Sequence, residues 1–227
     1  MDTTLKKVLL VGVASLLCAA SLLSCSKGDV HLKSDDKHGL YNTKTKISYS
    51  HAAPVYEATK LVQECGKLEV TDSESYALYT IPGAKPEEML ATEDYNIVYA
   101  NDLDMPTLQE MAPTILRVCN DSLEIRRMED AAVVARVVKA YAEGTSVDYP
   151  GTTPQRSYKA RFESLDYPGF YYTLTYVEYS EDLVVNDVNY GRYFLYNAYD
   201  RRFVPAGEDI RAALDAGLMP EGGNGHE

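Results

Sequence analysis

The chain has 227 residues, no tryptophan, 19 tyrosines and a formal net charge of −12 at pH 7. A negative field of that size repels nucleic-acid phosphates, so the composition argues against nucleic acid as a partner. The length allows one sizeable core or two small, closely packed halves.

The N-terminus has the pattern of a secretory leader. Lys6 and Lys7 provide a basic start, and an apolar run extends from Val8 to Leu23. The run is shorter than the roughly 20 residues that a membrane span needs, and polar residues follow it at once. We therefore expect residues 1–24 to be a cleaved signal peptide. An uncleaved anchor helix, or plain secretion after Ala19-Ala20, is the alternative.

The sequence Leu22-Leu23-Ser24-Cys25 closes this leader and resembles the lipobox of bacterial lipoproteins. The resemblance implies cleavage before Cys25, acylation of its sulfur and a lipid bilayer as a partner. Two or more acyl chains hold a protein stably, because each buried methylene contributes about 0.8 kcal/mol. Ser26 resembles the signal for sorting to the outer membrane, and Lys27 with Asp29 resembles surface-export signals. Periplasmic and surface display in the cell envelope both remain open.

The organisation of the rest follows from composition. Charged and polar residues dominate the stretch after Cys25 and leave little apolar surface to fold. We expect a lipidated cysteine and flexible tether over 25–43, a globular domain over 44–216 and a disordered tail over 217–227. The globular domain divides naturally into halves at 44–119 and 120–216.

The first half predicts strands mixed with helices. An apolar stripe from Pro54 to Cys65, followed by Gly66, predicts a helix. A second stripe from Pro106 to Cys119 predicts another, kinked at Pro113. The remaining elements are strands at 46–49, 68–70, 76–81 and 95–100 and a helical turn at 86–90.

The second half predicts a similar order. Asp130 is placed to cap a helix over 131–143 that ends before Gly144. The other expected elements are strands at 123–127, 157–163, 170–179, 190–198 and 202–204 and a final helix over 208–215.

These elements predict an α+β fold, in which one or two antiparallel sheets carry helices packed on one face. Residues 95–116 also match 193–214, since each stretch has a tyrosine-led strand, a turn, a proline and an amphipathic helix. A diverged duplication of a β-α-β-β-β-α unit would explain the match. Chance recurrence of a common pattern is the alternative.

Motifs for chemistry are scarce. No histidine is spaced with another histidine or a cysteine as a metal pair would be, and no nucleophile elbow or phosphate-binding loop occurs. We therefore expect no cofactor and no metal. Asp102 and Asp104 alternate as in a calcium loop but lack its third acid and glycine. A solvated turn, with Asp104 capping the next helix, is favoured.

Two carboxylates on neighbouring predicted strands, Glu163 and Glu178, are candidates for a glycosidase pair. Such enzymes need only two acids about 5 to 9 Å apart. Whether this pair meets depends on a strand register that the sequence does not fix. Cross-strand ion pairing of Glu163 with Lys159 or Arg161 is the alternative.

Tyrosines crowd the same strands. Tyr172 and Tyr176 lie on one predicted strand, and Tyr193 and Tyr196 lie on the next. Together they predict an exposed aromatic face suited to a sugar ring, a peptide or a partner protein. Ordinary cross-strand packing is the alternative.

Cys65 and Cys119 are the thiols left once Cys18 is removed and Cys25 is lipidated. Each falls at the end of a predicted helix. If those helices lie side by side, a disulfide would close a loop of about 54 residues and stabilise the fold by roughly 4 kcal/mol. Two independent buried thiols are the alternative.

The sequence thus favours an envelope lipoprotein with a non-enzymatic binding domain for a protein, a peptide or a glycan. An envelope hydrolase acting, for example, on glycans is the alternative. An aromatic face without convergent acids would favour binding, and a cleft in which two carboxylates converge would favour an enzyme.

Overall fold

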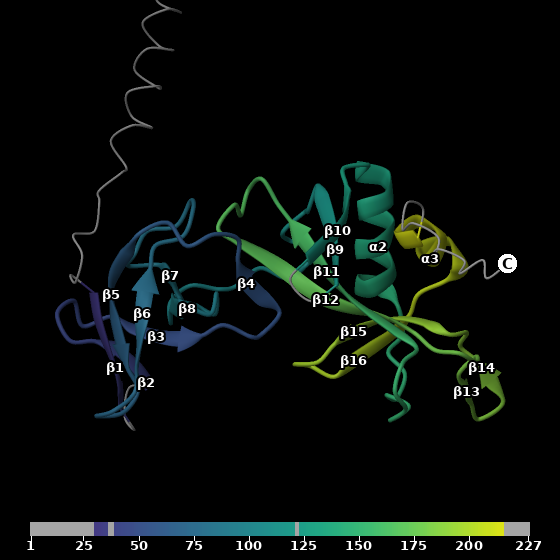
Figure 1. Cartoon of the computed structure of the whole chain (residues 1–227), viewed down its shortest axis with the longest axis horizontal. Coiled ribbons are helices and arrows are strands. Elements are labelled where there is room, and N and C mark those ends of the chain that lie inside the picture. Colours follow the sequence, from purple (N-terminus) through teal and green to yellow (C-terminus); the bar gives the residue numbers. More distant parts are fainter. Residues whose placement is uncertain (1–29, 36–38, 121–122, 216–227) are drawn as a thin grey trace, which may run out of the picture.

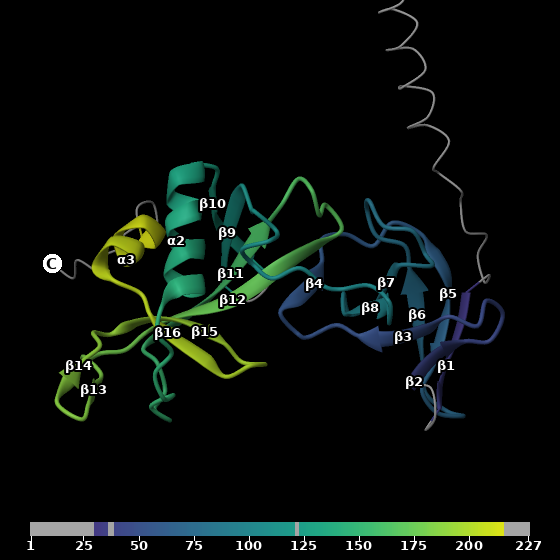
Figure 2. The same cartoon turned by 180° about the vertical axis from the view of Figure 1, so that it is seen from behind.

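The computed structural model describes residues 30–35, 39–120 and 123–215. Over these residues the chain is mostly β, with sixteen strands and two helices. It forms two lobes that lie side by side, an N-terminal barrel and a C-terminal sheet that carries both helices (Figure 1). The view from behind shows the same division (Figure 2). The predicted α+β class is wrong, because strands dominate the described residues and seven of them close into a barrel that carries no helix.

Seven short strands close the barrel in the order β1-β2-β3-β8-β7-β6-β5. Their bounds are β1 Val30–Asp35, β2 Gly39–Asn42, β3 Ser48–His51, β5 Glu64–Glu69, β6 Ser75–Tyr79, β7 Met89–Thr92 and β8 Ile97–Ala100. β1 and β5 pair in parallel, while the other neighbours are antiparallel. Closure leaves the barrel without a free strand edge.

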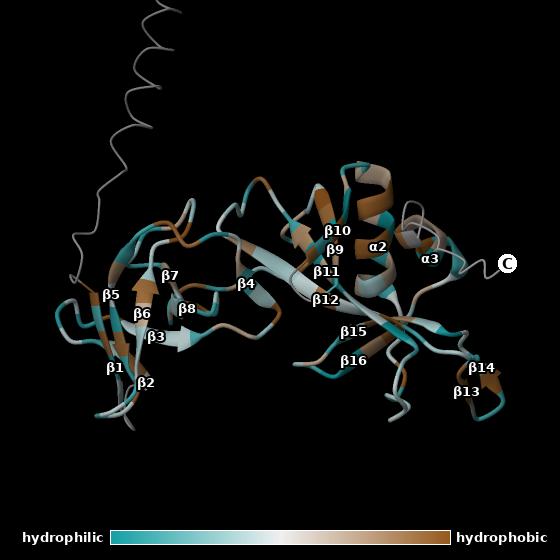
Figure 3. Cartoon of the chain, in the orientation of Figure 1, coloured by the Kyte–Doolittle hydropathy of each residue, from teal (hydrophilic) through white to brown (hydrophobic). Residues whose placement is uncertain are grey.

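Apolar side chains of the strands fill the interior of the barrel. Side chains at every second position of a strand point inward, and Figure 3 shows apolar residues on its strands. The largest buried side chains of this core include Leu32, Leu40, Tyr49, Leu68, Leu78, Leu90 and Val98. The Tyr49 hydroxyl is within hydrogen-bond distance of the Pro86 and Glu87 carbonyls, at 3.2 and 3.3 Å. The barrel is therefore a packed core and not a channel.

The parallel seam between β1 and β5 requires a glycine. Val30 pairs with Gly66, and a Cβ at Gly66 would lie 1.8 Å from the Val30 carbonyl oxygen. The pairing of β5 with β6 shifts register between Glu64 and Gly66, which bends the strand. Gly66, predicted to end a helix, instead lets two backbones approach closely enough to close the barrel.

The second lobe is a sheet in the order β10-β9-β11-β12-β15-β16, with β4 paired to β12. Its strands are β4 Tyr56–Ala58, β9 Ile115–Asn120, β10 Leu123–Met128, β11 Arg156–Glu163, β12 Phe170–Glu178, β15 Tyr193–Asn197 and β16 Arg202–Pro205. A separate hairpin joins β13 Val184–Val185 to β14 Val188–Asn189. The helices are α2 Ala131–Glu143 and α3 Glu208–Asp215.

The prediction of α2 is confirmed. The Asp130 side chain accepts hydrogen bonds from the backbone N–H groups of Ala132 and Val133, at 2.9 and 3.3 Å. These bonds satisfy donors that have no partner within the helix. α2 buries a stripe of apolar side chains in the main core, namely Val134, Val137, Val138 and Tyr141. α3 adds Ile210 and Leu214 to the same core.

β4 joins the two lobes. It pairs with β12, and Glu57 also forms an isolated bridge with Asn96 next to β8. The Glu57 carboxylate accepts from Lys159 at 2.9 Å and from Arg161 at 2.7 Å, both on β11. Apolar residues from both lobes share one core cluster. The barrel is thus held against the sheet by backbone pairing, ion pairs and a continuous core.

The predicted helix from Pro54 to Cys65 is wrong. Its apolar stripe is divided among three environments, because Val55 packs in the main core, Val62 is 57% exposed and Cys65 lies inside the barrel. The segment contributes β4 and the start of β5 instead. The predicted helical turn at 86–90 is present in part: the Met89 N–H donates to the Lys85 carbonyl at 2.9 Å, and β7 begins at Met89.

The predicted helix from Pro106 to Cys119 is also wrong. Thr107 and Glu110 form a capping box, but it closes a single turn. Ala112 then takes a φ of 44°, outside the helical region, and Pro113 follows it. The chain continues as β9. Asp104 therefore caps no helix, and Asp102 lies in a turn.

Two further expectations fail with these helices. The proposed duplication is not supported, because the two stretches that matched differ: the first follows β8 with a turn and β9, and the second follows β15 with β16 and α3. The expected tether over 25–43 is too long, since β1 and β2 are strands of the barrel. Val30 and Leu32 are buried while His31 and Lys33 face outward, so an amphipathic strand lies within a polar stretch.

Candidate functional site

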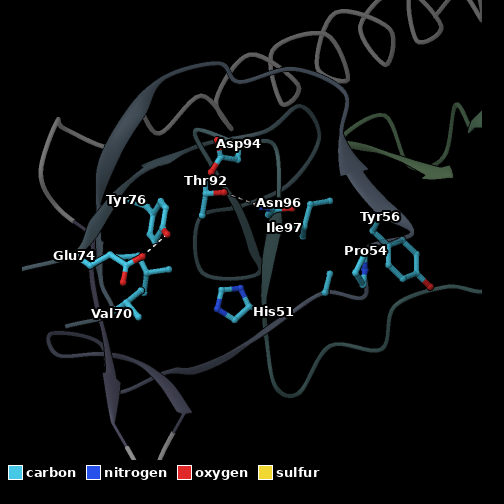
Figure 4. A pocket seen from close by; sticks show the side chains of 12 residues that line it. His51, Pro54, Tyr56, Val70, Glu74, Tyr76, Thr92, Asp94, Asn96 and Ile97 are labelled. Carbon is cyan, nitrogen blue, oxygen red and sulfur yellow. Dashed lines mark hydrogen bonds between the residues drawn. The ribbon is translucent and has the colours of Figure 1, made fainter. Parts of the chain in front are cut away.

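An open cavity of about 420 Å³ lies at one end of the barrel. Figure 4 shows His51, the Glu74–Tyr76 pair and Asp94 on different sides of its opening. Leu68 of β5 and Ile97 of β8 also line it, and both are almost fully buried, with exposed fractions of 1% and 2%. The cavity therefore has an apolar base next to the barrel core and a polar rim, within the size range of small-molecule sites.

The turn between β5 and β6 positions Glu74. The backbone N–H groups of Val70 and Thr71 donate to the Glu74 carbonyl, at 3.0 and 3.3 Å. The Tyr76 hydroxyl then donates to Glu74 Oε1 at 2.6 Å. This bond fixes the Glu74 carboxylate beside the opening, where it retains further acceptor sites.

The turn between β7 and β8 positions Asp94. Thr92 N–H donates to the Asn96 carbonyl at 2.8 Å, and Tyr95 N–H donates to the Thr92 carbonyl at 2.9 Å. Tyr95 has a φ of 64° and its side chain is 47% exposed. A bulky residue in this left-handed conformation is strained. The tight turn holds Asp94 at the rim, beyond Tyr76 from Glu74 (Figure 4).

The rim carries a negative potential. The pKa of Tyr76 is raised, first by its hydrogen bond to Glu74 and by the charge of that carboxylate, and further by Asp94 and Glu93. Desolvation lowers the pKa of His51 from 6.5, which favours the neutral ring at neutral pH. Among the residues that line the cavity there is no lysine or arginine to offset the carboxylates.

Tyr56 forms a wall and not a reactive group. Its ring lines the cavity, while its hydroxyl donates to the Pro106 carbonyl at 2.8 Å and points away from the opening (Figure 4). Desolvation, followed by the charges of Tyr99 and Glu110, raises its pKa to about 12. The phenol therefore stays protonated and serves to join the cavity wall to the second lobe.

The predicted tyrosine face does not form a binding surface. Tyr172, Tyr176 and Tyr193 are 7%, 1% and 8% exposed and pack in the main core. Tyr196 lies on the opposite face, because residues three apart on a strand point to opposite sides. There it stacks on Tyr149, with ring centroids 5.3 Å apart. The prediction is wrong for three of the four tyrosines, and core packing was the better alternative.

Cys65 and Cys119 are buried, and neither forms a disulfide. Cys65 lies on β5 inside the barrel, where its Sγ is 3.5 Å from the Leu78 carbonyl oxygen. Cys119 lies on β9 in the other lobe, where Arg161 donates to its Sγ at 3.8 Å. The helices that would have brought the two sulfurs together do not exist, so the expected disulfide has lost its geometric basis.

Glu163 and Glu178 lie far apart. Glu178 pairs with Arg156 across the ladder of β11 and β12, and Glu163 is at the other end of β11. A strand rises about 3.3 Å per residue, so the separation is about 23 Å. Glu163 binds Arg117 with a 2.6 Å ion pair, and Glu178 accepts from Tyr176 at 3.0 Å. A glycosidase pair made of these two residues is therefore ruled out.

Three further expectations concern the leader, a metal site and a membrane-spanning helix. Cys25 and the leader fall outside the described residues. In the described part of the chain, no group of three or more His, Cys, Asp or Glu side chains is placed to hold a metal ion. No helix there is both long and apolar enough to cross a membrane.

Sequence reasoning did not identify the cavity residues. Glu74, Tyr76 and Asp94 occupy ordinary turn and strand positions, and His51 is the last residue of β3. Only closure of the barrel brings these four together, since they come from β3, from the β5–β6 turn and β6, and from the β7–β8 turn. The turn-rich stretch at 71–74 predicts a loop near Glu74, but it does not indicate a binding site.

Comparison of the chain with protein-family models, with curated proteins and with solved structures finds no match in any of the three.

Proposed function

We propose that this protein is a lipid-anchored binding protein of the bacterial envelope, whose barrel cavity receives a small ligand or a projecting side chain. The cavity is the observation that carries the proposal. It is open, apolar at its base and polar at its rim, which is the usual composition of a ligand site. The tethered position would let it sample ligands close to a membrane.

The anchor rests on the leader and on Leu22-Leu23-Ser24-Cys25. Acylation of Cys25 would attach the chain to a membrane, with the outer membrane favoured by Ser26. Replacing Cys25 by Ala is expected to release the protein into the soluble fraction or leave an unprocessed precursor. A Cys25→Ala protein that is still cleaved and still retained on membranes would contradict the anchor. Protease treatment of intact cells separates surface display from periplasmic display.

Binding is favoured over catalysis by the surroundings of the two rim carboxylates. Glu74 and Asp94 both line the cavity, and a glycan hydrolase would also need two carboxyl groups at its site. A general acid in such an enzyme is a carboxyl group that burial keeps protonated. Both side chains here are exposed on turns, so water solvates the two charges. No serine or cysteine lines the cavity as a nucleophile.

The experiment is a ligand screen with a blocked cavity. Full-length protein is titrated with monosaccharides, capped amino acids and alkylamines, and binding is followed by calorimetry. Ala52 lines the cavity, so Ala52→Trp is expected to fill it and abolish binding. Val62 is exposed away from the cavity, and Val62→Trp serves as the control. If no compound binds in a manner that Ala52→Trp blocks, the proposal fails. Hydrolysis of a glycan that depends on Glu74 would favour the enzyme instead.

A further inference from the structure

The base of the cavity is suited to an aliphatic chain. Leu68 and Ile97 are buried beneath the opening, and Val70 and Pro54 add apolar wall. Burial of apolar surface here contributes about 25 cal/mol per Å² of surface removed from water. A ligand therefore gains affinity by inserting a hydrocarbon segment, and no polar partner is needed at the base.

The rim selects by charge. Glu74 is held in place by Tyr76, and Asp94 is held at the rim of the same opening by the β7–β8 turn. Two carboxylates that face one opening attract a cation and repel an anion. The lining includes no lysine or arginine that would satisfy them internally. The net charge of −12 adds a longer-range field of the same sign.

We propose that the cavity binds an alkylammonium group, with its methylenes on the apolar base and its ammonium between Glu74 and Asp94. This inference rests on the proposed binding function and specifies the ligand class. The ammonium has three donors, which match the acceptor oxygens of the two carboxylates. The chemistry has two sources, a lysine side chain on a polypeptide or a free alkyl diamine.

The geometry disfavours the other ligand classes. Anionic headgroups and phosphates meet two negative charges without a compensating cation. A neutral sugar would place some hydroxyl groups against the apolar side chains of Leu68 and Ile97, and burying a hydroxyl without a hydrogen-bond partner is unfavourable. An alkylammonium group avoids both costs, since its polar end stays at the rim.

The test compares ligands that differ only in charge. Full-length protein is titrated with Nα-acetyl-lysine N-methylamide, with cadaverine and with Nα-acetyl-norleucine N-methylamide, which keeps the aliphatic chain but lacks the ammonium. The two amines are expected to bind at least about tenfold more tightly than the norleucine compound at low salt, and to weaken as salt rises. Tighter binding of the capped lysine identifies a polypeptide source, and tighter binding of cadaverine identifies a free diamine.

Charge-neutralising variants complete the test. Glu74→Gln and Asp94→Asn keep the size of each side chain, and each is expected to weaken amine binding roughly threefold to tenfold. Glu87→Gln removes an exposed carboxylate outside the cavity and is expected to change nothing. Circular dichroism confirms that each variant is folded.

Three results would overturn the inference: equal affinity for the norleucine compound, equal weakening by Glu87→Gln, or no binding of either amine. If a sugar binds instead and Ala52→Trp blocks it, the ligand class is wrong while the binding function stands. If Ala52→Trp blocks no probe, the binding function fails as well.

Discussion

The seam between β1 and β5 gives the sharpest test of the architecture, because the two strands can pair there only if residue 66 has no Cβ. A Cβ there would lie 1.8 Å from the Val30 oxygen, 2.6 Å from its carbonyl carbon and 2.9 Å from its Cα. All three atoms are backbone, so no side-chain rotation relieves the overlap. Gly66→Ala must therefore push β1 away from β5.

The cost follows from what β1 buries. Val30 and Leu32 are 7% and 0% exposed in the barrel core, and burying such a side chain contributes about 1.5 to 3 kcal/mol. If Val30 and Leu32 both lose this burial, the free energy of unfolding is expected to decrease by about 3 to 6 kcal/mol. Denaturant titration of the full-length protein measures this decrease. Gly151 supplies the control, because its φ is 70° but a Cβ there meets no atom within 4 Å. Gly151→Ala should cost only about 1 kcal/mol. Equal effects of the two substitutions would refute the close approach of β1 and β5.

Two further predictions concern the ion pairs of Glu57 and the two buried thiols. Glu57→Gln is expected to lower the free energy of unfolding by about 1 to 3 kcal/mol, because it removes the charged acceptor shared by Lys159 and Arg161. The control is Lys85→Gln, which removes an exposed ion pair and should lower the free energy of unfolding by less than about 0.5 kcal/mol. Denaturant titration compares the two variants. Cys65 and Cys119 are expected to resist alkylation in the folded protein and to react fully after unfolding without a reductant, as counted by mass spectrometry; a missing pair of thiols would show that the disulfide forms.

The second lobe was predicted better than the barrel because its signals are local. Asp130, the apolar stripe of α2 and Gly144 lie within one stretch, and each acts on its own neighbours in sequence. The strands from Arg156 to Pro205 alternate clearly and are joined by short connections. The residues that determine such a helix or strand therefore lie within the element itself or next to it, where a periodicity in the sequence reveals them.

The barrel was missed because its determinants are distant in sequence. Gly66 matters through its contact with Val30, and β1 lies in a stretch whose charge suggests a tether. The stripe from Val55 to Cys65 has helical spacing, yet its members face different cores. Periodicity reports which residues are apolar and not which core they join. The cavity residues share this problem, because barrel closure alone makes them neighbours.

The last prediction concerns pH and follows from His51. Desolvation lowers the pKa of this ring from 6.5, so it is neutral above that value and takes up a proton only as the pH falls below it. The charged groups that line the same cavity are Glu74 from the β5–β6 turn and Asp94 from the β7–β8 turn, with the phenols of Tyr76 and Tyr56 on its walls. A protonated His51 places a positive charge at the rim and competes with an ammonium ligand. Because ligand binding then excludes a proton, amine affinity should be constant above about pH 7 and should fall by about twofold to tenfold between pH 7 and pH 5. His51→Gln retains both carboxylates and removes the titrating ring, so its affinity should stay flat over that interval. A flat profile in the unmodified protein, or an unchanged slope in His51→Gln, would show that His51 does not face the bound cation.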